Sequence, residues 1–199
     1  MKEQGISPEE ALKTLTQIDI AQVKVHGFKR CRFPGSMVLT YKQMVAKPQP
    51  AIEKEVYAIG DSVFAQPTKN IPQVETALAQ LKPHYNMVLV TKGDHEIQHW
   101  RLTQSGLKDF FEAVHVVDHK DSPLYKQIIQ HHKFEPAATC SIGDSLKSDI
   151  LTAMAVGTAG IWIPNNNWAD YEHAEPPADQ TYFKQIPHLT HLRATLENW

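Results

Sequence analysis

The sequence predicts an α/β protein in which a helical segment precedes a parallel sheet with helices on both faces. Beyond residue 72, short apolar runs alternate with segments of helical periodicity, roughly one pair every 25 residues. This alternation favours parallel pairing, because each helix returns the chain to the start of the next strand. Hydrophobic residues make up 42% of the chain and charged residues 21%, which is typical of a globular protein.

The first part of the chain carries helix signals and no obvious strand before about residue 56. Ser7 and Pro8 indicate a helix start, since serine caps free N–H groups and proline suits the first helical position. Glu10 completes a possible capping box. A second helix is expected to begin at Ser36 and to end at the proline-rich segment 47–50.

The second part alternates between helices and strands. Residues 87–90 (Met-Val-Leu-Val) form a continuous apolar run, which is typical of a strand buried on both faces. We expect helices over 72–82, 94–105 (closed by Gly106), 122–132 and 148–156, and strands over 87–90, 113–117, 139–142 and 159–163.

Composition and charge exclude several classes of protein. The 20 basic and 22 acidic residues leave a net charge of -2, so no long-range attraction to nucleic acid or to an anionic membrane is expected. No apolar run approaches the roughly 18 residues that a membrane span needs, and no apolar signal segment opens the chain. Cys31 and Cys140 cannot form a disulfide framework, and we therefore expect a cytoplasmic protein.

Polar side chains follow the predicted strands. In a parallel sheet, ligands bind at the carboxyl ends of the strands. The segment 91–93 (Thr-Lys-Gly), Lys120 and Asp144 stand at these ends, and Asp149 lies in the helical turn that follows. A hydroxyl, an ammonium and two carboxylates at one edge predict a phosphate and Mg²⁺ site, because carboxylate oxygens suit a hard cation.

At these residues the sequence resembles the haloacid dehalogenase (HAD) superfamily of hydrolases, most of which are phosphatases. Thr91 matches the second motif of the family, Lys120 the third, and Asp144 with Asp149 the fourth. The resemblance implies a HAD-like core with a Rossmann-like parallel sheet and helices on both faces, plus a helical cap. The resemblance is to the helical-cap branch of the superfamily. In that branch, residues 1–66 correspond to the later part of the cap, and residues 67–199 correspond to the core.

The resemblance also implies roles for single residues. Thr91, Lys120 and Asp144 would be catalytic, Thr91, Lys92 and Gly93 would bind substrate, and Asp144 with Asp149 would hold Mg²⁺. Complete relatives use an aspartate that attacks phosphorus and forms an aspartyl-phosphate, which water then cleaves. We therefore expect a phosphatase for a small phosphorylated metabolite or other anionic substrate. A homodimer is left open.

The nucleophile motif of the family, Asp-x-Asp-x-Thr/Val after an apolar strand, is not found in this sequence. Asp19 and Asp61 both lack the second carboxylate, although 59–62 (Ile-Gly-Asp-Ser) echoes 142–145. We therefore expect a truncated chain that starts inside the cap and is inactive alone. Two alternatives remain: a non-catalytic HAD-fold binding module or truncated gene product, and a 2-haloacid dehalogenase-like hydrolase.

The missing motif has a consequence for the sheet. In the family, the strand that carries it lies between the strands that end at Thr91 and at Asp144. The strands 87–90 and 139–142 are therefore expected not to pair directly. We expect a longer natural chain, a segment from 50–66 or a second chain to fill the gap between them.

Two further patterns are interpreted as structural. Residues 95–99 match the zinc pattern His-Glu-x-x-His, but Leu102 and Ser105 stand where the extended pattern needs glycine and histidine. We read this segment as an ordinary helix. The tryptophan-bounded stretch 162–168 resembles the loop after the fourth motif and is expected to form part of the rim of the site.

Overall fold

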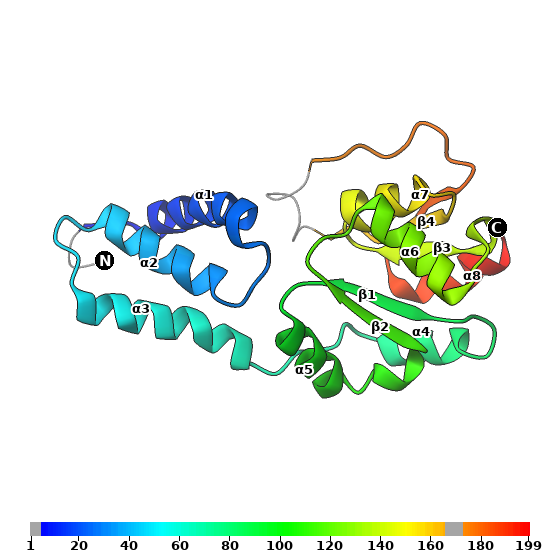
Figure 1. Ribbon diagram of the computed structural model, residues 1–199, viewed down its shortest axis with the longest axis horizontal. Helices are drawn as coiled ribbons and strands as arrows, with labels where there is room; N and C mark the ends of the chain where they lie inside the picture. The colour runs from blue at the N-terminus through cyan, green and yellow to red at the C-terminus, as the bar shows by residue number, and fades with distance from the viewer. Residues whose placement is uncertain (1–4, 166–172) are drawn as a thin grey trace. The chain divides into compact units, whose positions relative to one another are not determined.

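The computed structural model describes residues 5–165 and 173–199 and confirms the α/β class (Figure 1). Residues 166–168, part of the predicted rim, lie outside the described residues. The chain divides into two compact units. The first comprises Met1–Lys69, Leu89–Lys108 and Val114–Asp118, and the second Asn70–Val88, Asp109–Ala113 and His119–Trp199. The domains predicted from the sequence, 1–66 and 67–199, stay a prediction.

Three helices lead the first unit, α1 (Pro8–His26), α2 (Arg32–Met44) and α3 (Pro50–Ser62), followed by the short turn η2 (Val63–Ala65). Helix α2 packs against both α1 and α3. The Ser7 hydroxyl accepts the Glu10 N–H at 3.1 Å, which confirms the predicted cap. None of the described helices has the length and apolar character required to cross a bilayer.

Two details of these helices differ from the prediction. Helix α2 begins at Arg32, and Ser36 lies inside it as a buried residue whose hydroxyl donates to the Arg32 carbonyl at 3.0 Å. Pro50 does not mark a helix end but opens α3, in the first-turn position where its missing N–H costs no hydrogen bond. Local sequence does not distinguish these roles. Serine occurs both at the start of helices and inside them, and proline occurs both after the end of a helix and in its first turn.

A buried ion pair fastens α1 to α2. Arg32 pairs with Asp19, whose side chain is 3% exposed. The guanidinium of Arg32 also lies 5.2 Å from the centre of the Phe28 ring. Asp19 is therefore held as a structural partner of arginine, consistent with its rejection as the nucleophile.

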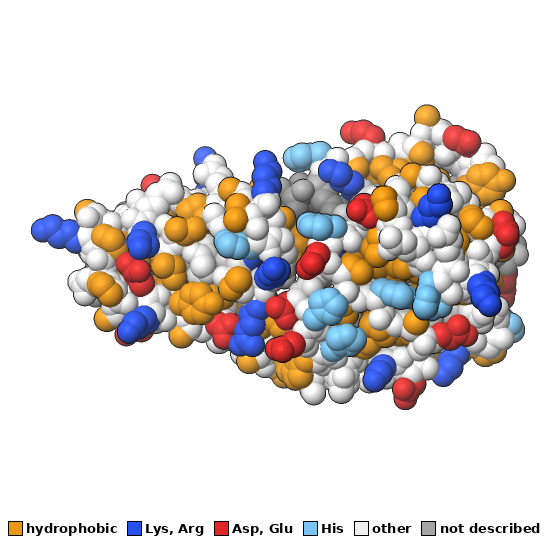
Figure 2. Space-filling view, in the orientation of Figure 1, with side chains coloured by type: hydrophobic (Ala, Val, Ile, Leu, Met, Phe, Trp, Pro, Cys, Tyr) orange, Lys and Arg blue, Asp and Glu red, His pale blue; other side chains and the backbone are white. Residues whose placement is uncertain are grey.

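Apolar side chains are exposed over the helices of this unit (Figure 2). Among them, Leu12, Val25 and Ile59 are 64%, 71% and 61% exposed. Nothing in the structure shows what would cover them, and the homodimer considered from the sequence stays a prediction.

The remaining elements of the first unit are β1 (Val88–Lys92), α5 (His95–Ser105) and β2 (Ala113–Val117). Strands β1 and β2 pair with each other. The Asp94 carboxylate caps α5 by accepting the Ile97 N–H at 3.3 Å, and Gly106 ends the helix with φ 70°. These bounds confirm the elements predicted over 87–90, 94–105 and 113–117.

The second unit contains a three-stranded parallel sheet in the order β3–β4–β5. Buried side chains of this unit include Ile161, Phe183 and Leu192. The elements of this unit are α4 (Val74–Leu81), η3 (Lys108–Phe110), α6 (Ser122–His132), η4 (Pro136–Ala138), β3 (Cys140–Gly143), the π-helical turn η5 (Leu146–Leu151), α7 (Thr152–Met154), β4 (Ala159–Trp162), β5 (Phe183–Gln185), η7 (Leu189–His191) and α8 (Leu192–Glu197).

Most predicted elements of this unit are confirmed, with two exceptions. The helix expected over 148–156 is instead the π-helical turn η5 followed by the short α7. Strand β5 and helix α8 were not predicted, because three residues of strand and six of helix carry too little periodicity.

Within the described residues, the strands form two sheets, not the single predicted sheet. Strand β1 lies in the first unit and β3 in the second, and the strand expected between them stays a prediction. The suggestion that 50–66 supplies an intervening strand is wrong, because 50–62 forms helix α3 and 63–65 the turn η2.

We predict that Gly60→Ala destabilises the protein by about 1–3 kcal/mol through overpacking. Gly60 is buried in α3, and an added Cβ would lie 2.8 Å from the Met37 sulfur and 2.8 Å from the Pro34 Cα. The measurement is the free energy of unfolding in urea. Gly35→Ala, in α2, is the matched control, because a Cβ there meets nothing within 4 Å. Equal losses in the two variants would contradict the close packing of α2 on α3.

Candidate active site

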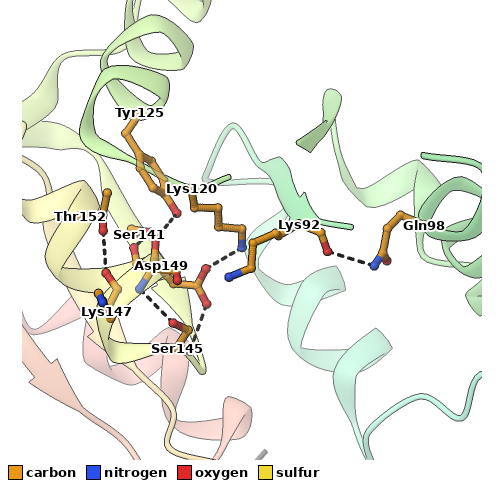
Figure 3. A network of polar contacts seen from close by, with 10 residues as sticks. Lys92, Gln98, Lys120, Tyr125, Ser141, Ser145, Lys147, Asp149 and Thr152 are labelled. Carbon is orange, nitrogen blue, oxygen red and sulfur yellow. Dashed lines mark hydrogen bonds and ion pairs between the residues drawn. The ribbon is translucent and has the colours of Figure 1, made fainter. Parts of the chain in front are cut away.

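A buried ion pair joins two of the predicted site residues in the second unit (Figure 3). The Lys120 ammonium lies 2.5 Å from Asp149 Oδ1, and the two side chains are 12% and 9% exposed. The other carboxylate oxygen, Oδ2, accepts the Ser145 N–H at 3.1 Å. Because both charges are largely out of water, each depends on the other for compensation.

Gly143 is required at the end of β3 by this arrangement. A Cβ on Gly143 would lie 2.6 Å from Asp149 Cγ and 2.5 Å from Asp149 Cβ. The Asp149 side chain therefore lies directly over the Gly143 Cα. The glycine of the Gly-Asp pattern makes room for the second aspartate, five residues after the first.

The turn that carries Asp149 is a π-helix, η5. The Ser145 hydroxyl caps its start by accepting the Ser148 N–H at 2.9 Å. At its end, the Thr152 N–H bonds to the Lys147 carbonyl, five residues back. π-helical turns are rare and occur frequently at functional sites.

Asp144 is held from the end of β4. The Asn165 side-chain amide donates to Asp144 Oδ2 at 2.7 Å, and the Trp162 indole N–H donates to the Asp144 carbonyl at 2.9 Å. The Trp162 bond fixes the backbone of the loop that follows β3, and the Asn165 bond orients one oxygen of the half-buried Asp144 carboxylate.

The carboxylate oxygens at this site are of the type that binds a hard cation, but they are few. Mg²⁺ is bound through one or two carboxylates and retains several waters. Asp144 and Asp149 supply carboxylates, although Lys120 and the Ser145 N–H already bind the latter. In the part of the chain that the structure describes, no three His, Cys, Asp or Glu side chains come together. A cation here would therefore depend mainly on Asp144.

The predicted substrate-binding segment 91–93 belongs to the first unit. Thr91 and Lys92 end β1, and the Lys92 ammonium lies 4.5 Å from the centre of the Phe28 ring. Gly93 has φ +147°, and a Cβ there would lie 2.7 Å from the Gln98 amide nitrogen. That amide donates to the Lys92 carbonyl at 3.2 Å, so the turn after β1 is well defined and requires glycine.

The site residues are thus distributed over both units. Lys120, Asp144 and Asp149 lie in the second unit, and the structure joins Lys120 to Asp149 directly. The assembly of segment 91–93 with these three residues, and the individual catalytic roles, stay predictions.

Asp61 is bound by arginine on both carboxylate oxygens. Arg30 Nε and Nη2 donate to Asp61 Oδ1 and Oδ2, each at 2.6 Å. These charged hydrogen bonds hold the pKa of the Asp61 carboxyl below its usual value. A carboxylate in this bidentate pair is a poor nucleophile, which agrees with its rejection from the sequence.

The two histidines of the His-Glu-x-x-His segment lie on the exposed surface of a helix. His95 and His99 are exposed on α5, with ring centres 6.4 Å apart. Neither belongs to a three-residue metal cluster among the residues that the structure describes.

Sequence reasoning missed the hydrogen bonds that hold the site, although it placed residues 162–165 in the predicted rim. Ser141 and Thr152 bond to the π-helical turn, and Trp162 and Asn165 bond to Asp144. Nothing in the local pattern marks these contacts, because they join elements 5 to 21 residues apart.

Comparison with known proteins identifies the family. A model of the haloacid dehalogenase-like hydrolases matches residues 8–163. The chain belongs to this family. The match includes α1–α3 as well as the strands and loops that carry Lys120, Asp144 and Asp149.

Two curated relatives are phosphatases. The chain is 26% identical over 110 residues to a glyceraldehyde 3-phosphate phosphatase of Pyrococcus furiosus, covering 52% of this chain and 46% of the relative. It is 32% identical over 98 residues to a pyrimidine 5'-nucleotidase of Streptococcus pneumoniae, covering 46% and 41%. The matched parts thus span less than half the length of either relative.

Solved structures share the fold. A HAD-like hydrolase of Xanthomonas campestris has a TM-score of 0.78 at 25% identity, covering 92% of this chain and 74% of that one. YfnB, a HAD hydrolase of Bacillus subtilis solved with bound magnesium, has a TM-score of 0.67 at 19% identity, covering 98% and 86%.

We predict that Lys120→Met lowers the free energy of unfolding by about 3–5 kcal/mol, because it leaves the buried Asp149 charge uncompensated. Urea denaturation measures the loss, and Lys120→Met combined with Asp149→Asn should lose less than Lys120→Met alone.

The matched control is Arg193→Met, which breaks the exposed pair of Arg193 with Glu197, 46% and 52% exposed. It should cost less than about 1 kcal/mol. A Lys120→Met loss no larger than that of Arg193→Met would show that burial of the pair contributes nothing.

Proposed function

We propose that these residues form the phosphate- and cation-handling part of a HAD phosphatase that acts on a small phosphorylated metabolite. The observation that carries the proposal is the buried Lys120–Asp149 pair beside the Asp144 loop. Family membership supports hydrolase chemistry. Both curated relatives named above are phosphatases of small molecules, which supports a phosphate ester as substrate.

Each residue of the proposed site has a distinct task. The Lys120 ammonium offsets negative charge on the phosphate and on the attacking group, because a fixed cation stabilises charge that develops in the transition state. The Thr91 hydroxyl orients a phosphate oxygen. Mg²⁺, when bound at Asp144 with help from Asp149, would supply further charge neutralisation.

The proposed reaction needs a nucleophilic carboxylate, and the sequence contains no Asp-x-Asp pair. Asp61 is bound to Arg30 and Asp19 to Arg32. We therefore propose that these 199 residues do not turn over phosphate esters by themselves. A phosphatase is favoured over a dehalogenase, because Asp144 and Asp149 offer carboxylates to a cation and both curated relatives are phosphatases.

We predict no hydrolysis of p-nitrophenyl phosphate above the buffer rate by the purified chain with Mg²⁺, because groups that position phosphate cannot replace the nucleophile. Release of p-nitrophenolate measures this. Asp61→Asn should not change the result. Turnover that Asp61→Asn abolishes would identify Asp61 as the nucleophile and contradict the assignment.

We also predict that Mg²⁺ raises the melting temperature of the chain and that inorganic phosphate enhances the effect. Asp144→Asn should remove most of this shift, because it removes the main oxygen donor. Thermal unfolding at increasing Mg²⁺ concentrations measures it.

Asp109→Asn is the control, since Asp109 is an exposed carboxylate of the same unit outside the site. A Mg²⁺-dependent shift that is unchanged in Asp144→Asn would place cation binding elsewhere. An absence of any shift in the unmodified chain would favour the non-catalytic alternative.

A further inference from the structure

Three hydroxyl groups donate to three consecutive carbonyls of the π-helical turn η5 (Figure 3). Thr152 Oγ1 donates to the carbonyl of residue 147 at 2.6 Å, and the Tyr125 hydroxyl to that of residue 148 at 3.2 Å. Ser141 Oγ donates to the carbonyl of Asp149 at 2.7 Å. The last of these carbonyls belongs to the residue whose carboxylate meets Lys120.

The three hydroxyls come from different elements. Tyr125 lies on α6, Ser141 on β3, and Thr152 at the start of α7. A fourth hydroxyl, that of Ser122 at the start of α6, donates to the Thr152 carbonyl at 3.1 Å. Helix α6 begins two residues after Lys120. The start of α6 therefore adjoins the lysine and also bonds to the segment that carries Asp149.

The Tyr125 hydroxyl keeps the proton with which it donates to the turn. Burial raises the pKa of this phenol well above its ordinary value, and the nearby negative charge of Asp149 raises it further, whereas a hydrogen bond with Ser141 acts in the opposite direction. The phenol therefore stays protonated throughout the physiological pH range and donates to the turn.

The position of the Asp149 carboxylate depends on this backbone register. One residue of helical offset rotates a side chain by about 100° around the helix axis. In η5 the N–H of residue 152 bonds five residues back, not four. The Asp149 N–H bonds four residues back, to the Ser145 carbonyl at 3.0 Å, so the five-residue step follows Asp149. A shift of residues 146–149 by one place would direct the Asp149 side chain away from Gly143 and away from Lys120.

We propose that Tyr125, Ser141 and Thr152 are positioning residues of this site, whose hydroxyls hold η5 in the register that brings the Asp149 carboxylate to Lys120. Their relevance to catalysis rests on the proposed function. The positional effect itself can be measured in the absence of substrate and metal.

The test uses the Lys120 side-chain ammonium as a reporter in ¹H–¹⁵N NMR spectra of the full chain. A buried ammonium paired with a carboxylate exchanges its protons slowly with water, and Lys120→Arg assigns the signal by its loss. In Thr152→Val, which replaces a hydroxyl by a methyl of similar shape, we expect exchange to become at least tenfold faster or the signal to be lost. Thr152→Ser should restore it.

Thr195→Val is the matched control, because the Thr195 hydroxyl donates to the His191 carbonyl at 2.9 Å on α8, outside the site. Ser141→Ala and Tyr125→Phe, measured in the same way, should behave like Thr152→Val. They also provide the test if Thr152→Val does not fold.

Folded variants that melt at a lower temperature but keep the exchange rate of the unmodified chain would overturn the proposal, since the hydroxyls would then only stabilise the unit. Because neither substrate nor Mg²⁺ is present, the exchange measurement does not depend on the proposed function. Faster exchange combined with no Mg²⁺-dependent shift in the melting temperature of the unmodified chain would preserve the positional role and reject the proposed function.

Discussion

The burial of one lysine with one aspartate governs the geometry of the second unit. Two charges that leave water lose several kcal/mol of hydration each, and they recover it only when partners and hydrogen bonds are well placed. Here the Asp149 carboxylate has Lys120 on one oxygen and the Ser145 N–H on the other. The glycine at 143 and the π-helical turn both follow from the need to fit that carboxylate over the end of β3.

Elements with strong local signals could be predicted closely from the sequence. Helix α5 begins after Asp94, whose side chain caps it, and ends at Gly106, whose positive φ few other residues adopt. Helix α6 begins after Asp121, which accepts the Leu124 N–H at 2.8 Å, and ends at its predicted last residue. In these cases, the residues that determine the ends lie within the element or next to it.

Features that depend on distant contacts could not be predicted. The π-helical turn between β3 and α7 accepts a hydrogen bond from Tyr125, more than 20 residues away. The indole of Trp162 bonds to the Asp144 carbonyl 18 residues earlier. The motif residues themselves were found because their spacing is a sequence property, whereas their hydrogen-bond partners are defined only by the fold.

The π-helical turn also bears on how relatives of this chain are aligned. A π-helix contains one residue more than an α-helix that joins the same two end points, so a single deletion between 145 and 149 would still let the flanking strand and helix superimpose. Such a deletion would nevertheless leave the second carboxylate facing a different direction. The five-residue interval between Asp144 and Asp149 is therefore better treated as a fixed length than as a region where gaps are allowed.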